Sequence, residues 1–355
     1  MRVLTVVGAR PQFVKAAPVS RALRVRHEER LLHTGQHYDD ALSRVFFEDL
    51  RIPAPDVHMD VAALDVGQRL AAMVRGIRAE IAASQPDVVM VYGDTDSTLA
   101  GALAARREGV PLAHVEAGLR SHNLRMPEEV NRIAADHVSD LLLCPTEVSR
   151  AQLLRERARG RAVVVGDVML DACLQSADAG RALRVLERFG LEPGGYYACT
   201  LHRAENTDDG ERLRTLVRTL DSLDRPVLLP CHPRTRAALA REGLGEGLTG
   251  LRLLEPLRYP EMLGLVADAR ALLTDSGGLQ KEAYFLGVPC VTLRDETEWV
   301  ETVRSGWNRL AGADERRIRD AVRAAQAPPG ERDLAEYGAG EASQRLVEAL
   351  EESFA

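Results

Sequence analysis

The sequence lacks any apolar run near the ~20 residues that a membrane-spanning helix requires. Its first residues also lack the basic start and the long apolar stretch of a secretory signal peptide, because a short strand-like segment, residues 1–8, leads directly into Ala9-Arg10-Pro11. These two absences argue against a membrane partner. We therefore expect a cytoplasmic protein.

The sequence also lacks a Cys-x-x-Cys pair, and Asp94-Thr95-Asp96 stands alone rather than within a calcium-binding loop. We therefore predict that no metal ion is bound. Five cysteines are scattered along the chain, most of them within or beside apolar runs: Cys144, Cys173, Cys199, Cys231 and Cys290. This placement is typical of buried, reduced thiols.

A basic excess is absent too, since the net charge is -7 and the isoelectric point is near 5.8. Nucleic-acid binders usually carry such an excess, so the composition argues against a nucleic-acid partner. An anionic ligand remains compatible with this charge, because a few Arg, Lys and His residues can dominate the potential of one site.

Two common nucleotide-binding motifs are missing. No Gly-x-x-x-x-Gly-Lys occurs, which disfavours a Walker-type NTPase, and no Gly-x-Gly-x-x-Gly follows the first predicted strand, which disfavours a Rossmann dinucleotide site. A nucleotide, if one binds, must be held by other means.

The composition that is present suits two folded domains. The chain has 355 residues, and domains average roughly 150 residues. Hydrophobic residues make up 45% and charged residues 28%, the balance of an ordinary globular protein with normal cores.

Short apolar runs alternate with segments of helical period, which predicts the α/β class with parallel sheets covered on both faces. The predicted strands form two series: Val3–Val7, Arg30–Thr34, Val88–Tyr92, Leu112–Val115, Leu141–Cys144 and Ala162–Val165, then Tyr196–Leu201, Val227–Cys231, Leu251–Leu254, Ala271–Thr274 and Cys290–Leu293. Predicted helices include Val66–Ser84, Thr98–Arg107, Glu211–Leu223 and Tyr259–Ala267.

The gap between the two series marks the domain boundary. Two linking helices, Leu170–Ser176 and Arg181–Phe189, separate the series. We predict an N-terminal doubly wound domain over residues 1–166 and a C-terminal one over 167–340. The last helix, within residues 341–355, is expected to pack back on the first domain.

Polar residues follow several predicted strands of the first series. Ligands of open parallel sheets bind beyond the carboxyl ends of the strands, and Lys15, Asp94 and Glu116 lie just past three such ends. Asp94 and Glu116 end neighbouring strands, and several carboxylates in one pocket suit acid–base chemistry. Glu128 and Arg132 are spaced i, i+4 at a helix start, where the plainer interpretation is a surface ion pair.

The second series ends in residues suited to a diphosphate. Ser276-Gly277-Gly278 lets the backbone approach a ligand closely, and the helix that follows points free N–H groups at the loop. Glu282 lies on the next turn, where it can face a ribose or simply contact solvent. Asp275 is interpreted as an ordinary helix cap, and a single strand-end histidine such as His202 is more often structural than catalytic.

Six motifs occur in order along the chain: Val7-Gly8-Ala9-Arg10-Pro11-Gln12, Tyr92-Gly93-Asp94-Thr95, His114-Val115-Glu116-Ala117-Gly118-Leu119-Arg120, Pro127-Glu128-Glu129-Val130-Asn131-Arg132, Thr200-Leu201-His202-Arg203-Ala204-Glu205-Asn206 and Thr274-Asp275-Ser276-Gly277-Gly278. With them the chain resembles the non-hydrolysing UDP-N-acetylglucosamine 2-epimerase family over residues 2–345. The resemblance implies a GT-B fold, in which two Rossmann-like domains face an interdomain cleft. It also implies a homodimer, a UDP-sugar substrate and no cofactor.

The resemblance further implies a mechanism. UDP leaves carbon 1 as a proton is removed from carbon 2, and UDP then adds back to the 2-acetamidoglucal intermediate after reprotonation on the other face. Roles follow by motif position: acid–base carboxylates at Asp94, Glu116 and Glu128, a catalytic histidine at His202, and substrate contacts at Arg10, Lys15, Arg132, His232, Ser276, Gly277, Gly278, Glu282 and Arg294.

The sequence departs from many bacterial members at Gln36-His37-Tyr38-Asp39-Asp40, where they have Gln-His-Arg-Glu in a region linked to allosteric substrate binding. The amino-acid sequence at residues 33–38, 125–127 and 297–301 is closer to that of the branch that includes UDP-2,3-diacetamido-2,3-dideoxyglucuronate 2-epimerases. That uronate is therefore an alternative substrate. A hydrolysing epimerase, a GT-B glycosyltransferase and a non-catalytic nucleotide-sugar sensor are more distant alternatives.

Overall fold

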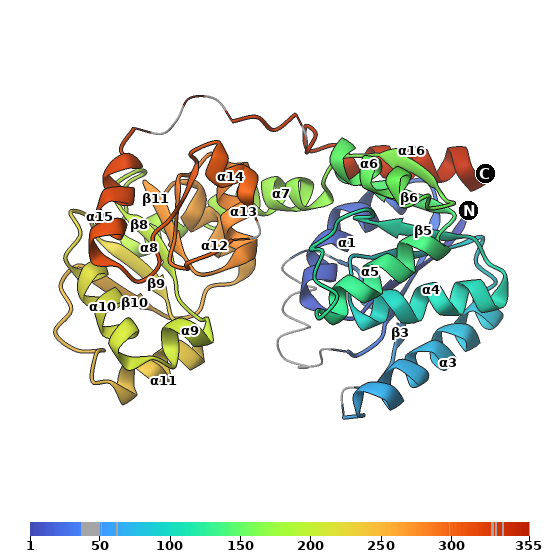
Figure 1. Cartoon of the computed structure of the whole chain (residues 1–355), viewed down its shortest axis with the longest axis horizontal. Helices are drawn as coiled ribbons and strands as arrows, with labels where there is room; N and C mark the ends of the chain where they lie inside the picture. Colours follow the sequence, from blue (N-terminus) through green and yellow to red (C-terminus); the bar gives the residue numbers. More distant parts are fainter. Residues whose placement is uncertain are drawn as a thin grey trace. The chain divides into compact units, whose positions relative to one another are not determined.

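The computed structural model describes residues 1–36, 50, 52–61, 63–297, 299–327, 330, 332–335 and 337–354, apart from the side chains of Arg10 and Val66. The chain divides into two compact units (Figure 1): unit 1 comprises Met1–Ala172 and Leu334–Ala355, and unit 2 comprises Cys173–Asp333. The chain enters unit 2 within helix α7 (Val168–Ala182), six residues after the predicted boundary.

Unit 1 contains a seven-stranded parallel sheet in the order β3-β2-β1-β4-β5-β6-β7. Its strands are β1 (Arg2–Val7), β2 (Glu28–His33), β3 (Val57–His58), β4 (Val88–Tyr92), β5 (Leu112–Val115), β6 (Leu141–Cys144) and β7 (Arg161–Val164). Strand order reverses between β1 and β4, which makes the carboxyl ends of these two strands the switch point of a doubly wound fold.

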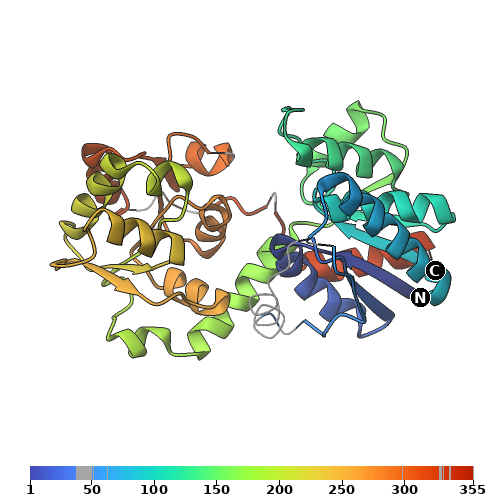
Figure 2. The ribbon, with the colours of Figure 1, turned by 90° about the horizontal axis from the view of Figure 1, so that it is seen from below.

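Helices join the strands of unit 1: α1 (Arg10–Leu23), α3 (Val66–Ser84), α4 (Asp96–Glu108), α5 (Pro127–Val138), α6 (Glu147–Arg155) and the first turn of α7. Local sequence sets their ends, since Asp65 and Thr95 cap α3 and α4, and Gly109 ends α4 with φ 70°. The last helix, α16 (Ala342–Phe354), packs on α1 (Figure 2), and its Glu351 pairs with His27 at 2.8 Å.

Unit 2 repeats this topology with a six-stranded parallel sheet in the order β10-β9-β8-β11-β12-β13. The strands are β8 (Tyr197–Thr200), β9 (Val227–Pro230), β10 (Leu251–Leu254), β11 (Ala271–Thr274), β12 (Cys290–Thr292) and β13 (Asn308–Leu310). The switch point lies between β8 and β11. The predicted α/β class, with two Rossmann-like doubly wound sheets, is confirmed.

The helices of unit 2 follow the same alternation: the rest of α7, α8 (Val185–Phe189), α9 (Ala204–Thr207), α10 (Gly210–Asp221), α11 (Pro233–Arg241), α12 (Tyr259–Ala267), α13 (Gly277–Leu286), α14 (Val300–Arg304) and α15 (Glu315–Ala324). Among the strands that the structure describes, the sequence pattern missed two short edge strands, β3 and β13, which have two and three residues. A period of two cannot be recognised over so few positions.

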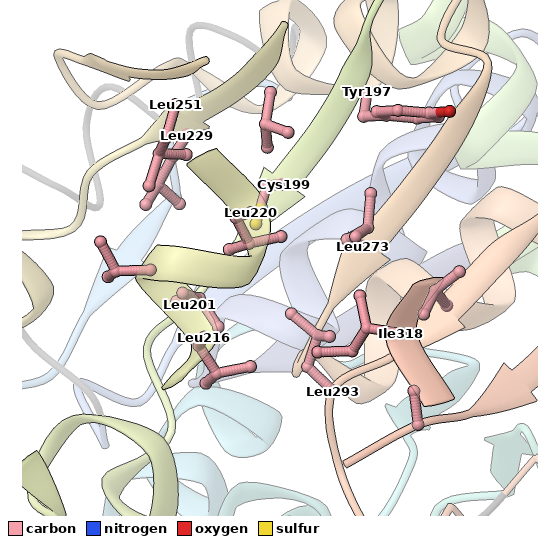
Figure 3. Packing of buried hydrophobic residues seen from close by; sticks show 14 of the residues in the cluster. Tyr197, Cys199, Leu201, Leu216, Leu220, Leu229, Leu251, Leu273, Leu293 and Ile318 are labelled. Atoms are coloured by element: carbon pink, nitrogen blue, oxygen red, sulfur yellow. The ribbon is translucent and has the colours of Figure 1, made fainter. Parts of the chain in front are cut away.

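Each face of the unit 2 sheet buries its own core because successive strand residues point to opposite sides. Tyr197, Cys199 and Leu273 pack with α10 and α15 on one face, as Figure 3 shows. Tyr196 and Leu272 instead enter the cluster on the other face. This double coverage fixes the strand register and therefore the positions of the loops that follow β8 and β11.

All five cysteines are buried thiols outside any disulfide, as predicted. Burial raises the pKa of the Cys144 and Cys290 thiols to about 12, which keeps both protonated and unreactive at neutral pH. Among the helices that the structure describes, none combines the length and the apolar character that crossing a bilayer demands.

The contact between α7 and α12 predicts that replacing Gly180 destabilises the fold. A Cβ atom on Gly180 would lie 1.9 Å from the carbonyl oxygen of Pro260, whereas one on Gly67 of α3 would meet only Asp65 Oδ1 at 3.5 Å. Gly180→Ala should therefore lower the free energy of unfolding by roughly 1–3 kcal/mol. Urea denaturation monitored by circular dichroism measures this change. Gly67→Ala is the control and should be neutral or slightly stabilising; equal midpoints for the two variants would contradict the prediction.

Candidate active site

Lys15 and Glu116 form an ion pair at the carboxyl edge of the unit 1 sheet. Lys15 comes from the second turn of α1 and Glu116 from the loop after β5, and each side chain is only 13% exposed. Burial alone would lower the pKa of Lys15, but the neighbouring Glu116, aided by Asp94, raises it. The ammonium is therefore a fixed positive charge at the switch point, as the position of Lys15 in the sequence predicts.

The backbone of Glu116 is left-handed, with φ 70°. This conformation costs about 1–3 kcal/mol for a residue other than glycine. Gly93, at the end of β4, lies so close that a Cβ atom there would be 3.2 Å from Glu116 Oε2 and 3.4 Å from Lys15 Nζ. His114 Nε2 lies 2.7 Å from the Gly93 carbonyl oxygen and fixes this turn.

Asp136 of α5 holds the loop that carries Glu116. It is fully buried and accepts hydrogen bonds from His114 Nδ1 at 2.7 Å, Gly118 N at 3.2 Å and Arg120 at 2.7 Å. Burial alone would raise the pKa of Asp136, but His114 and Arg120 together lower it. One buried carboxylate thus binds the chain on both sides of Glu116 and maintains its strained backbone.

Asp94 forms an ion pair with Arg132, which comes from α5. The spacing of Glu128 and Arg132 allows an i, i+4 ion pair, but this pair does not form. Arg132 instead contacts Glu129 at 3.3 Å in addition to Asp94. Glu128 is exposed at the start of α5 and has no ion pair or hydrogen bond to the other groups within the described part of the chain.

Sequence reasoning did not single out Glu129, which is 1% exposed. Its carboxylate accepts the backbone N–H groups of Ser121 at 2.9 Å and His122 at 2.8 Å. Burial raises its pKa, but these two hydrogen bonds and Arg132 lower it overall. The adjacent acidic pair in the first turn of α5 was the only signal in the sequence, and it does not show which of the two glutamates points inward.

The loop after β8 carries His202, whose Nδ1 lies 3.1 Å from Asp275 Oδ1 in the loop after β11. Asp275 is fully buried and also accepts the backbone N–H groups of His202 at 3.0 Å and Arg203 at 2.9 Å. Burial alone would raise the pKa of Asp275, but the His202 side chain and these N–H groups lower it. The interpretation of Asp275 as a helix cap is therefore wrong. The residue that caps α13 is Ser276.

Ser276, Gly277 and Gly278 form the N-terminal turn of α13. The Ser276 side chain accepts a hydrogen bond from Leu279 N at 3.4 Å, and the Gly277 carbonyl accepts one from Trp299 Nε1 at 2.7 Å. Gly278 is exposed, and a Cβ atom placed on it would meet no heavy atom within 4 Å. The turn is thus open on the side where a diphosphate can reach the first N–H groups of the helix.

Glu282, one turn further along α13, is 5% exposed. Tyr259, the first residue of α12, donates its hydroxyl to Glu282 Oε1 at 2.6 Å. Burial raises the pKa of Glu282 to about 7, although the hydrogen bond from Tyr259 opposes the shift. This carboxylate is therefore poised to change charge near neutral pH, and it is not a solvated surface group.

The remaining predicted positions have varied surroundings. Exposed His232 caps α11 by accepting Arg234 N at 3.2 Å, and buried Arg294 lies 3.7 Å from Glu205 Oε1. The backbone of Arg10 begins α1, but its side chain lies outside the described atoms.

Residues 37–40 of the segment 36–40, and Glu298 of the segment 297–301, also lie outside the described residues. Gln36 is described, and its side-chain oxygen accepts hydrogen bonds from Ser97 N at 3.0 Å and Ser97 Oγ at 2.7 Å. These bonds connect the residue three positions after β2 to the start of α4. Among the described residues, no group of three or more His, Cys, Asp or Glu side chains is arranged to hold a metal ion.

Comparison with known proteins identifies the family. A family model described as UDP-N-acetylglucosamine 2-epimerase matches residues 21–351. The chain is 46% identical over 359 residues to the UDP-2,3-diacetamido-2,3-dideoxy-D-glucuronate 2-epimerase of Pseudomonas aeruginosa, with 99% of both chains covered. It is also 42% identical over 355 residues to a UDP-N-acetylglucosamine 2-epimerase homolog of Methanococcus maripaludis, again with 99% of both covered.

A solved structure agrees with these relatives. The crystal structure of Methanocaldococcus jannaschii UDP-GlcNAc 2-epimerase in complex with UDP-GlcNAc and UDP matches this chain with a TM-score of 0.83 at 36% identity, covering 99% of this chain and 100% of that one. Similarity over nearly the full length, at this identity, is decisive. The chain belongs to the UDP-N-acetylglucosamine 2-epimerase family.

Proposed function

We propose that the protein is a non-hydrolysing epimerase that inverts carbon 2 of UDP-N-acetylglucosamine and yields UDP-N-acetylmannosamine. The observation that carries this proposal is the pairing of two carboxylates with two cations, Glu116 with Lys15 and Asp94 with Arg132, at one edge of a sheet in a chain of this family. A glycosyltransferase that uses the same fold has no need for such a set of acid–base groups.

The reaction proceeds by elimination and addition. A carboxylate takes the proton from carbon 2, the electrons of that bond form the carbon 1–carbon 2 double bond, and the bond from carbon 1 to the diphosphate oxygen breaks. A proton then returns to carbon 2 on the other face, and the diphosphate oxygen attacks carbon 1 again. Because the carbon 2 proton is barely acidic, its removal must accompany departure of a good leaving group.

Asp94, Glu116 and Glu128 are the acid–base groups of this proposal, with one carboxylate serving each face of the sugar. Lys15 and Arg132 hold two of these carboxylates in position through the ion pairs described above. In both pairs the carboxylate follows a strand at the carboxyl edge of the unit 1 sheet and the cation comes from a helix, α1 or α5, and ligands of doubly wound sheets bind beyond that edge.

Unit 2 binds the nucleotide in this proposal. His202 and the turn at Ser276, Gly277 and Gly278 stabilise the charge that grows on the departing UDP, and Glu282 accepts the ribose hydroxyls. Arg10, His232 and Arg294 are further substrate contacts that the family resemblance implies. The homodimer, the cytoplasmic location and the lack of a metal or cofactor stay predictions.

One alternative substrate is favoured by a specific observation. The relative at 46% identity is a UDP-2,3-diacetamido-2,3-dideoxy-D-glucuronate 2-epimerase, and the same elimination applies to that sugar. Assaying both UDP-sugars side by side and comparing kcat/KM separates the two proposals.

Isotope incorporation tests the reaction itself. In deuterated buffer, UDP-N-acetylglucosamine should acquire deuterium at carbon 2 in both substrate and product, because each proton removed exchanges with solvent. NMR spectroscopy follows both sugars. Asp94→Asn should lower the exchange rate by roughly 10²–10⁴-fold, since a positioned acid–base group contributes about that much.

Three results would contradict the proposal. Epimerised product without deuterium would exclude the elimination route, and free N-acetylmannosamine with UDP would indicate a hydrolysing enzyme. Binding of UDP-sugar with no exchange and no product, from either candidate substrate, would indicate a sensor.

Gly278→Ala separates nucleotide binding from folding. The added methyl group meets no atom of the protein but would occupy the open side of the α13 turn, where a phosphate oxygen must approach. We expect the dissociation constant for UDP to rise at least ~10-fold, while thermal stability stays equal or increases by up to ~1 kcal/mol. Isothermal titration calorimetry measures the affinity, and Gly67→Ala is the control. An unchanged UDP affinity in Gly278→Ala would contradict the proposed binding of the diphosphate at the first turn of α13.

Glu282→Gln tests the ribose contact through pH. Ribose hydroxyls donate to the ionised carboxylate, so binding favours the charged form of a group whose pKa lies at about 7 in the free protein. Binding therefore releases a proton below that pH, and the affinity of the wild type for UDP should increase from pH 6 to pH 8. Glu282→Gln should show a shallower increase.

Calorimetry in two buffers of different ionisation enthalpy counts the protons released. UDP itself titrates in this range, but it does so equally with both proteins, so only the difference between them reports on Glu282. Identical pH profiles for the wild type and the variant would show that this carboxylate does not bind the ribose.

A further inference from the structure

Asp275 makes more contacts than are needed to hold the loop after β8 in place. It is fully buried, its two oxygens accept the backbone N–H groups of His202 and Arg203, and Oδ1 also lies 3.1 Å from the Nδ1 atom of the His202 ring. The backbone contacts alone account for the position of the loop. The ring contact adds a direct relation between a buried carboxylate and the imidazole.

A second set of hydrogen bonds, from Asn206 and Arg212, fixes the orientation of the Asp275 carboxylate. Asn206 Nδ2 donates to Asp275 Oδ2 at 3.1 Å and to the Leu293 carbonyl at 3.0 Å, while Arg212 Nε donates to Asn206 Oδ1 at 2.7 Å. The arginine identifies the acceptor end of the amide, so the nitrogen of Asn206 must face the carboxylate. Asp275 therefore cannot rotate away from the imidazole without breaking this chain of hydrogen bonds.

An ionised carboxylate only accepts hydrogen bonds, so Asp275 favours a proton on the ring nitrogen that lies 3.1 Å from it. The other ring nitrogen of His202, Nε2, has no partner among the residues that the structure describes, and the side chain is 43% exposed. The two nitrogens of His202 are thus unequal: one faces the protein interior and the other is open to a ligand.

We propose that Asp275 is a positioning residue that keeps a proton on Nδ1 of His202, so that Nε2 is the nitrogen presented to the departing diphosphate. This inference rests on the proposed function, in which His202 acts on the leaving group. The carboxylate fixes the tautomer and the ring orientation, and it stabilises positive charge on the ring when Nε2 also holds a proton. The arrangement has the logic of the carboxylate–histidine pairs of hydrolases, here built from the loops after two adjacent strands.

The tautomer can be measured without turnover. In protein labelled with 15N at histidine, a two-dimensional 1H–15N multiple-bond spectrum distinguishes a protonated Nδ1 from an unprotonated one, and the signals missing in His202→Gln assign the residue. We expect Nδ1 of His202 to be protonated in the wild type at pH 8. An unprotonated Nδ1 would overturn the inference, and this readout requires no variant of Asp275 to fold.

Kinetics test the consequence. Asp275→Asn should lower kcat by roughly 10²–10⁴-fold and leave KM within a few-fold, because the amide no longer selects one tautomer. The matched control is Asp221→Asn. Asp221 also accepts three backbone N–H groups in unit 2, from Thr249, Gly250 and Leu251, but no histidine in the described part of the chain pairs with it. Asp221→Asn should keep wild-type kcat.

A double-mutant cycle distinguishes positioning from loop support. If Asp275 acts through the imidazole, Asp275→Asn should change kcat less than ~3-fold in a His202→Gln background. An equal loss in both backgrounds would show that Asp275 merely holds the loop, and would overturn the inference. Absence of all epimerisation by the wild type would instead refute the proposed function, while the tautomer measurement would still decide the role of Asp275.

Discussion

Each unit has a fully buried aspartate beneath a loop that carries a predicted catalytic residue, Asp136 beneath Glu116 and Asp275 beneath His202, and the position of that residue depends on how the buried charge is compensated. An isolated carboxylate in a protein interior is costly, so several donors must converge on it. Asp136 collects donors from both sides of Glu116, and Asp275 collects them from the loop that contains His202. The need to satisfy the buried charge therefore dictates where the neighbouring reactive side chain stands.

This constraint explains how residues from separate motifs come together. Register in a parallel sheet places the ends of adjacent strands side by side, but it does not by itself orient the side chains beyond them. In unit 1 the orientation comes from Asp136 and from the close approach of Gly93 to Glu116 and Lys15. Unit 2 uses the same solution with a different outcome, a histidine with one inward and one open nitrogen. One topology, used twice, thus holds a carboxylate–lysine pair in unit 1 and an aspartate–histidine pair in unit 2.

The sequence predicted the elements whose period is long enough to recognise, and the predicted bounds of β4, β5, α3 and α12 match the structure. It also placed Lys15, Asp94 and Glu116 at one sheet edge. It did not predict that Glu129, and not Glu128, points inward, because two adjacent glutamates in a first helical turn look alike as a pattern. The sequence also did not predict that Asp275 is buried and accepts several hydrogen bonds. An aspartate between a strand and a helix has the same sequence pattern whether it caps the helix or is buried.

The difference in burial between the Lys15–Glu116 pair of unit 1 and His202 of unit 2 suits the proposed elimination and re-addition. Glu116 and Lys15 are each 13% exposed, whereas His202 is 43% exposed and the Gly278 turn is open. Proton exchange through Glu116 benefits from the burial of that group, because a carboxylate that water solvates little reorganises little during the reaction. UDP, by contrast, must stay bound while it is detached from the sugar. In the proposed function, the contacts from unit 2 to the ribose and diphosphate meet that requirement, because they do not depend on the bond that breaks.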